Sequence, residues 1–197
     1  MRRNIRHSGL VLSAGVLISL VFSSTYLNVG FAQQVSVANP PNVAGFNDHI
    51  NQYMALHDAA VKKLPNPGKQ TAKPEKIENY EEGLANLIRT TRTNAKQGDI
   101  FTPEVATHFR KVIKAEFTPA RLKDLKMEAN GPDVQGVPLR VNYPYPETKE
   151  LVDTPATLLL KLPQLPKGLG YHFAKRNLLL IDREARIIVD YIPNALP

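Results

Sequence analysis

Residues 171–192 read YHFAKRNLLLIDREARIIVDYI, which is three short apolar runs separated by two charged connections. The runs are Tyr171–Ala174, Leu178–Asp182 and Ile187–Ile192. Short apolar runs joined by tight polar turns are typical of consecutive antiparallel strands. We therefore expect a three-stranded antiparallel β-meander at the C-terminus.

The middle run, Leu178–Ile181, does not alternate between apolar and polar residues. This pattern predicts a central strand that is covered on both faces, with helices on one side. The other side is covered either by a loop or helix of the same chain, or by a partner subunit or added strand. Under the second alternative, Leu179, Ile181 and Ile188 are the candidates for a partner-binding face.

Apolar residues recur at helical spacing over the preceding half of the chain. The spacing predicts an amphipathic helix from Phe46 to Leu64 and a longer one that begins after Pro74 and ends before Gly98. Three Thr-Pro pairs place a capping hydroxyl before a proline suited to the first helical position. They predict helices over Pro103–Phe117, from Pro119 to about Met127, and from Pro155 to about Leu162.

Together these elements predict an α+β fold in a single domain at 46–197, helical over 46–128, loop-rich over 129–153, with a short helix and the meander over 154–197. Within the loop-rich part, Val137–Tyr143 is the one plausible strand, and Pro144 and Pro146 confine it to a sheet edge. Residues 33–45 are expected to form a flexible lead-in, because Pro40-Pro41 excludes a regular helix across it.

The first 32 residues are typical of an export signal. Arg2, Arg3 and Arg6 precede an apolar run at 10–22, and Ala32 fits a processing site. We expect cleavage after Ala32 and a periplasmic or secreted protein, with an uncleaved N-terminal anchor as the alternative. Removing the three arginines lowers the formal net charge from +7 to +4, which argues against nucleic acid as a partner.

Composition excludes several classes of enzyme. The 197 residues contain no cysteine and no tryptophan, so thiol chemistry, disulfides and a tryptophan-lined sugar platform are excluded. Only Ser36 lies beyond the export signal, in the lead-in, which is no scaffold for a serine nucleophile. No glycine loop in the right context for a phosphate or dinucleotide is present, so no cofactor is expected.

Two groups of basic residues are the candidate anion- or partner-binding site. Arg89, Arg92 and Lys96 fall within about 60° of one another on the second helix. If the second and third helices form an antiparallel hairpin, this group merges with the second into one basic surface; the alternative is a solvated helix face. The second group is Arg110, Lys111 and Lys114.

Histidine and carboxylate residues offer weaker candidates. His49 and His57 are two helical turns apart, about 12 Å, which is too far for one metal ion, so no metal ligands are assigned. His108 or His172 near Asp190 is the least implausible acid–base pair. Alternation places Asp190 on the strand face of Ile188 and Ile192, where burial requires a partner such as Arg176 or Arg186.

The chain resembles an uncharacterised group of exported bacterial proteins. The resemblance is carried by GDIFTPE at 98–104, NLLLID at 177–182 and IIVDYIP at 187–193, and it spans most of the chain after the export signal. It implies a periplasmic or secreted setting and no particular activity.

The sequence thus predicts an exported, non-enzymatic binding module. Its partner is expected to be an envelope protein or an anionic cell-wall or lipid component. The alternatives are a carboxylate- and histidine-dependent hydrolase or lyase of the cell envelope, and a metal-buffering protein. No catalytic residue is assigned.

Overall fold

The computed structural model describes residues 41–65, 73–129, 136, 138–146, 148–149 and 151–197. The predicted export signal and residues 33–40 of the predicted lead-in lie outside them. Residues Val37–Pro197 form one compact unit, and all of its described buried core residues lie between Val43 and Leu196. Within the described residues, no helix is both long enough and apolar enough to cross a membrane.

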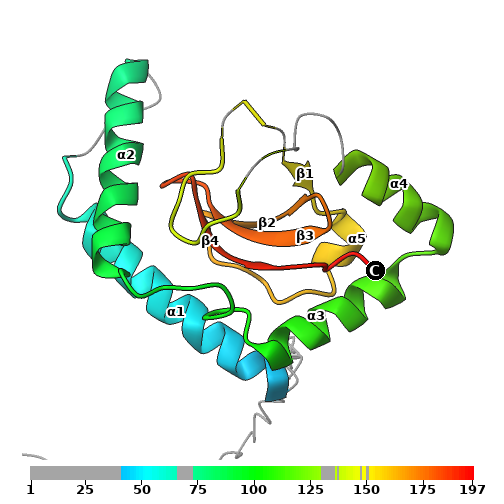
Figure 1. The fold of residues 1–197 in the computed structure, drawn as a ribbon. Coiled ribbons are helices and arrows are strands. Elements are labelled where there is room, and N and C mark those ends of the chain that lie inside the picture. Colours follow the sequence, from blue (N-terminus) through cyan, green and yellow to red (C-terminus); the bar gives the residue numbers. More distant parts are fainter. Residues whose placement is uncertain (1–40, 66–72, 130–135, 137, 147, 150) are drawn as a thin grey trace, which may run out of the picture. The chain divides into compact units, whose positions relative to one another are not determined.

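The predicted α+β fold is confirmed (Figure 1). Helices precede an antiparallel sheet of four strands, in the order β1-β2-β3-β4. The last three strands are the predicted meander, with β3 in the middle. The helices are α1 Pro41–Val61, α2 Pro74–Thr91, α3 Pro103–Glu116, α4 Pro119–Ala129 and α5 Ala156–Leu159; the strands are β1 Val152–Asp153, β2 Leu169–Ala174, β3 Asn177–Asp182 and β4 Ile187–Ile192.

Two predicted helix starts need correction. α1 begins at Pro41, five residues before the predicted Phe46, because a proline in the first helical turn lacks only an N–H that has no partner there. The Thr154 hydroxyl does not cap a helix. It donates to the carbonyl of Tyr171, and α5 is a single four-residue turn that ends well before Leu162. The Thr102 hydroxyl, by contrast, accepts from the amide of Val105, as a capping residue should.

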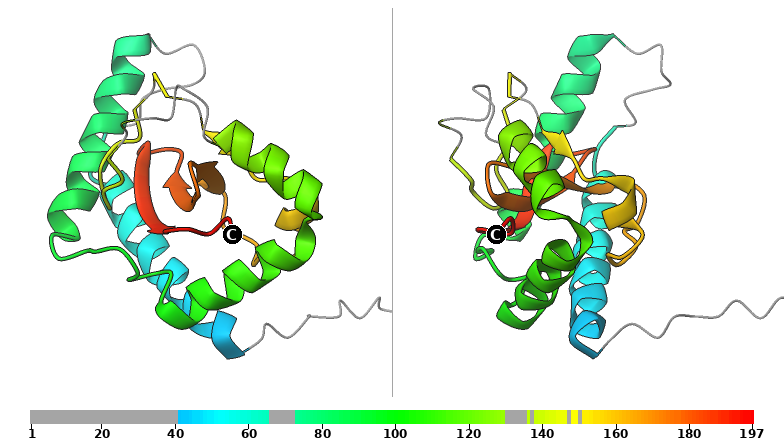
Figure 2. Two further views of the ribbon diagram at one scale, coloured as in Figure 1. Left: turned by 45° about the vertical axis from the view of Figure 1, so that its right-hand side comes forward. Right: turned by 90° about the vertical axis from the view of Figure 1, so that its right-hand side faces the viewer.

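α2 and α3 do not form the expected antiparallel hairpin (Figures 1 and 2). Each packs instead at a different end of α1, and the connecting residues 92–102 run past the end of β4. The Asp190 carboxylate holds this connection through the backbone amides of Gly98, Ile100 and Phe101. The two predicted basic groups are therefore not brought together by a helical hairpin.

The sheet has one hydrophobic cluster on each face. The larger includes Phe46, Phe109 and Leu180, and the helices supply half of its buried side chains. On the opposite face, Leu179, Ile181 and Ile188 pack with Tyr145, Leu139 and Leu151. The cover on this second face is thus the described part of residues 138–151, which we call the covering segment. These residues correct the partner-face prediction, because Leu179, Ile181 and Ile188 are at most 4% exposed.

The covering segment is not a strand in the described residues 138–143, contrary to the prediction for Val137–Tyr143. Its backbone nevertheless bonds to β4. The amide of Asn142 donates to Ile188 O at 2.7 Å, and Ile188 N donates to Tyr143 O at 3.0 Å. An isolated bridge follows at Pro144, whose ring removes a ladder donor and so prevents a longer strand.

An irregularity in β4 changes the predicted orientation of Asp190. Leu180 pairs with Asp190 but Ile181 pairs with Ile188, so Val189 is the extra residue of a β-bulge. Ile188 therefore faces the covering segment, whereas Ile192 belongs to the helix-side cluster. Asp190, opposite Leu180, lies on the helix side and not on the face of Ile188.

Candidate functional site: a cationic pocket between α2 and the covering segment

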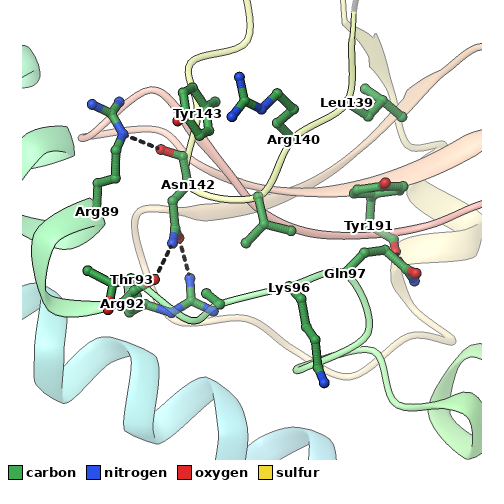
Figure 3. A pocket seen from close by; sticks show the side chains of 12 residues that line it. Arg89, Arg92, Thr93, Lys96, Gln97, Leu139, Arg140, Asn142, Tyr143 and Tyr191 are labelled. Atoms are coloured by element: carbon green, nitrogen blue, oxygen red, sulfur yellow. Dashed lines mark hydrogen bonds between the residues drawn. The ribbon is translucent and has the colours of Figure 1, made fainter.

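The C-terminal end of α2, the connection that follows it and the covering segment enclose a pocket of about 460 Å³ (Figure 3). We call it the cationic pocket. Four of its lining residues are basic and none of the described ones is acidic. They are Arg89, Arg92, Lys96 and Arg140, and the aromatic rings of Tyr143 and Tyr191 complete the wall.

Asn142 joins the two walls of this pocket. Its side chain donates to the carbonyl of Arg92 at 3.0 Å and accepts from Arg92 Nη1 at 2.7 Å. Asn142 has φ +63°, a left-handed conformation that asparagine tolerates better than most residues. The same residue therefore closes the end of α2, orients the Arg92 guanidinium and fixes the turn of the covering segment.

Tyr143 brings two further cations close together. The guanidinium carbons of Arg140 and Arg89 lie 3.8 Å and 4.7 Å from the centre of its ring. Since both distances share the ring centre, the two carbons are at most 8.5 Å apart, the sum of these values. Tyr143 therefore holds both cations at this wall of the pocket through cation–π contacts.

Arg92 is partly buried, and this burial disfavours its charged form. Burial lowers the pKa of the Arg92 guanidinium, while Tyr53, Asp190 and Asp99 act in the opposite direction. The guanidinium carbon lies 5.1 Å from the centre of the Tyr53 ring, and Tyr53 in turn donates to Asp182 at 2.5 Å. No carboxylate of the described residues lies at hydrogen-bond distance from Arg92, and a partly desolvated cation of this kind gains electrostatically from an incoming anion.

The structure divides the predicted basic residues. Arg89, Arg92 and Lys96 line the cationic pocket, whereas Arg110 donates to the carbonyl of Pro193 at 2.8 Å. Lys111 lines a different depression on α3, and Lys114 is exposed in the last turn of that helix. Arg140 was not predicted, because it lies in an irregular segment with no periodicity to indicate its direction.

The predicted acid–base constellation is not assembled. His172 pairs with Leu179, which faces the covering segment, whereas Asp190 lies on the helix side of the sheet. His108 is on α3 beside Lys111. Among the described residues, no group of three or more histidine or acidic side chains could hold a metal ion. His57 lies near Asp182 and Glu184, at 3.5 Å and 3.6 Å.

Asp190 is a structural carboxylate with a full set of donors. It is completely buried and accepts from the backbone amides of Gly98, Ile100, Phe101 and Tyr191 at 2.7–2.9 Å. Burial raises its pKa, and the four hydrogen bonds oppose that shift. Neither Arg176 nor Arg186 is its partner: Arg176 donates to Leu196 O, and Arg186 pairs with Glu81.

Comparison with models of known families, with curated proteins and with solved structures finds no match to this chain. The resemblance to exported bacterial proteins therefore stays a prediction.

Proposed function

We propose that this protein is an exported, non-enzymatic binding module whose cationic pocket takes an anionic group of an envelope component. The observation that carries the proposal is the convergence of four cations from two separate stretches of chain on one pocket without an acidic lining residue among those described. Arg89 comes from α2, Lys96 from the connection after it, and Arg140 from the covering segment.

The helix dipole accounts for part of this arrangement only. Cations are favoured near a helix C-terminus, which suits Arg89 in the last turn of α2 and Arg92 just after it. Arg140 belongs to no helix, and Lys96 lies beyond the last turn, where the dipole has largely faded. Bringing these two toward the same cavity adds like-charge repulsion, which a bound anion would relieve.

The lining also favours binding over catalysis. The described wall offers hydroxyl, amide, guanidinium and ammonium groups, and no histidine or carboxylate to act as a general base. Its volume, about 460 Å³, is in the range of small-ligand sites. A phosphate and a carboxylate both satisfy this chemistry, and both are displayed by envelope polymers and lipids.

Affinity measurements on residues 33–197 test the proposal. The probes are tripolyphosphate, trigalacturonate, and vesicles of phosphatidylglycerol with phosphatidylcholine vesicles as reference. The variant Arg89→Gln/Lys96→Gln/Arg140→Gln neutralises three pocket cations and leaves the Arg92–Asn142 contact in place. We expect at least one anionic probe to bind it about tenfold more weakly than the wild type, because charge-assisted hydrogen bonds are lost.

A matched control separates the pocket from general charge. The variant Lys111→Gln/Lys114→Gln/Arg121→Gln removes three exposed positive charges from α3 and α4. We expect it to stay within about twofold of the wild type. Equal losses in both variants, or no binding of any anionic probe, would contradict the proposal. The probe that responds identifies the source as phosphate polymer, uronate polymer or lipid.

A further inference from the structure

A second pocket, of about 310 Å³, is lined by later residues of the covering segment, among them Tyr145, Lys149 and Leu151. Its described wall combines three basic residues, Lys149, Arg183 and Arg186, with apolar side chains of Leu151 and Ile181. Arg186 is already paired with Glu81. The pocket therefore joins a cationic rim to an apolar floor, unlike the mostly polar cationic pocket.

Arg183 is placed at this rim by a glycine. Its side chain crosses β2 at Gly170, where an added β-carbon would lie 2.6 Å from Nη2 and 2.8 Å from Nε. A larger residue here would require the flexible end of the Arg183 side chain to shift, so the glycine leaves room for the guanidinium although it weakens a strand interior. The Arg183 amide also donates to Gly168 O at 2.8 Å, which anchors the turn from which the side chain extends.

Arg183 has no carboxylate within salt-bridge distance among the described residues. The Asp153 carboxylate, which is close to this region, lies 3.3 Å from His172 Nδ1 instead. A guanidinium held across a strand at the rim of a pocket, without an anionic partner, is a ready donor for an external carboxylate.

His172 forms part of the wall at the same place. It is 8% exposed and lines the pocket. Its Nδ1 makes no hydrogen bond to any described residue, because the nearby Asp153 oxygen lies outside hydrogen-bond geometry. This atom is shielded from solvent and lies beside the Asp153 carboxylate, so His172 forms part of the wall of the pocket and offers no free donor to a ligand.

From these observations we infer that this pocket binds a small amphiphilic carboxylate. The carboxylate lies on Arg183 with Lys149 and His172 beside it, and the short apolar body covers Leu151 and Ile181. This inference concerns a different cavity from the proposed function and does not depend on it. A purely inorganic anion would leave the apolar floor uncovered, which is why a carboxylate with a hydrocarbon part is the favoured class.

NMR titration of residues 33–197 with hexanoate, hexanol and inorganic phosphate tests it. We expect hexanoate to shift the methyl signals of Leu151 and Ile181 with saturation at millimolar concentration, and to bind about tenfold more tightly than hexanol or phosphate. Equal affinity for phosphate and hexanoate would overturn the inference. So would the absence of saturable shifts up to about 20 mM hexanoate.

Two variants locate the carboxylate. Arg183→Gln removes the guanidinium, and Gly170→Ala displaces it while keeping its charge. Each should weaken hexanoate binding about tenfold, whereas Arg121→Gln should leave it unchanged. If Gly170→Ala does not fold, Arg183→Gln alone decides, because Arg183 is exposed. Wild-type affinity of Arg183→Gln for hexanoate would contradict the inference. The triple variant of the cationic pocket, by contrast, is expected to bind hexanoate with wild-type affinity.

Discussion

At the scale of single residues, Asp190 shows how a buried charge can be structural. Its four amide donors come from the connection after α2 and from β4 itself, so one carboxylate ties a loop to the sheet. Its burial could be expected from the sequence, because an acidic residue interrupts an apolar strand. Its hydrogen-bond partners could not be predicted, because they are backbone amides, which residue types do not distinguish.

Replacing Asp190 by alanine should lower the free energy of unfolding by about 3 kcal/mol or more, because several buried N–H groups lose their acceptor. Chemical denaturation measures the change. Asp124→Ala, at an exposed position of α4, should change the same quantity by less than about 0.5 kcal/mol. A similar small loss in Asp190→Ala would show that the connection does not depend on this carboxylate.

His172 predicts a pH dependence of stability. Burial, and next the charge of Arg183, lower the pKa of His172 below its ordinary value, while Asp153 acts in the opposite direction. The unfolded chain then binds a proton more readily than the folded one. The contribution of neutral His172 to stability is therefore fully present above the pKa that His172 has in the unfolded chain, about 6.5. It is lost as the pH falls through the lowered pKa that His172 has in the folded protein.

Urea denaturation of the wild type and of His172→Gln over about pH 7 to pH 5 measures this contribution. We expect the stability of the variant to fall less steeply with acidification, because glutamine does not titrate. Parallel curves for the two proteins would contradict the assignment.

At the scale of elements, local signals predicted well and non-local ones did not. Hydrophobic periodicity and the proline at each helix start identified α2, α3 and α4, and short apolar runs identified β2, β3 and β4. β1 has only two residues, which is too short for a periodic pattern. The covering segment is Pro-rich and has no periodic pattern. Backbone hydrogen bonds to β4, about 45 residues away along the chain, hold it in place, for example between Asn142 and Ile188.

The covering segment also explains why the candidate site was only half predicted. The sequence indicated Arg89, Arg92 and Lys96 together because it predicted one helix that ends before Gly98. That end is wrong: α2 ends at Thr91, so Arg92 is its C-cap and Lys96 lies in the connection that follows. Arg140 joins them because Asn142 fastens the covering segment to the end of α2. That contact is tertiary, so no helical or strand periodicity in the sequence indicates it.

Asn142→Gly tests the role of this fastening. Glycine keeps the left-handed backbone conformation and removes only the side chain. We expect a folded protein in which hydrogen exchange at the Asn142 position and Ile188 is faster, and in which the anionic probes bind about three- to tenfold more weakly. Asn94→Gly, in the exposed connection after α2, is the matched control. Unchanged exchange and affinity would show that Arg92 and the covering segment are held by other contacts.

At the scale of the whole molecule, the chain closes both faces of its sheet with its own segments. Helices cover one face and the covering segment the other, so the apolar residues first considered for a partner are used internally. Among the described residues, four cations gather where the covering segment meets α2, and the most exposed large apolar side chains, Leu160 and Met127, lie outside that pocket. The proposed binding role is therefore centred on charge and not on an apolar sheet face.

The central claim is that the cationic pocket binds an anionic group. NMR observation of the arginine Nε–Hε signals of residues 33–197 during titration with tripolyphosphate tests it most directly. We predict that the signals of Arg89, Arg92 and Arg140 shift together with one saturable dissociation constant, while that of Arg121 does not move. Saturable shifts elsewhere with those three signals unchanged, or no saturable shift at all, would contradict the claim.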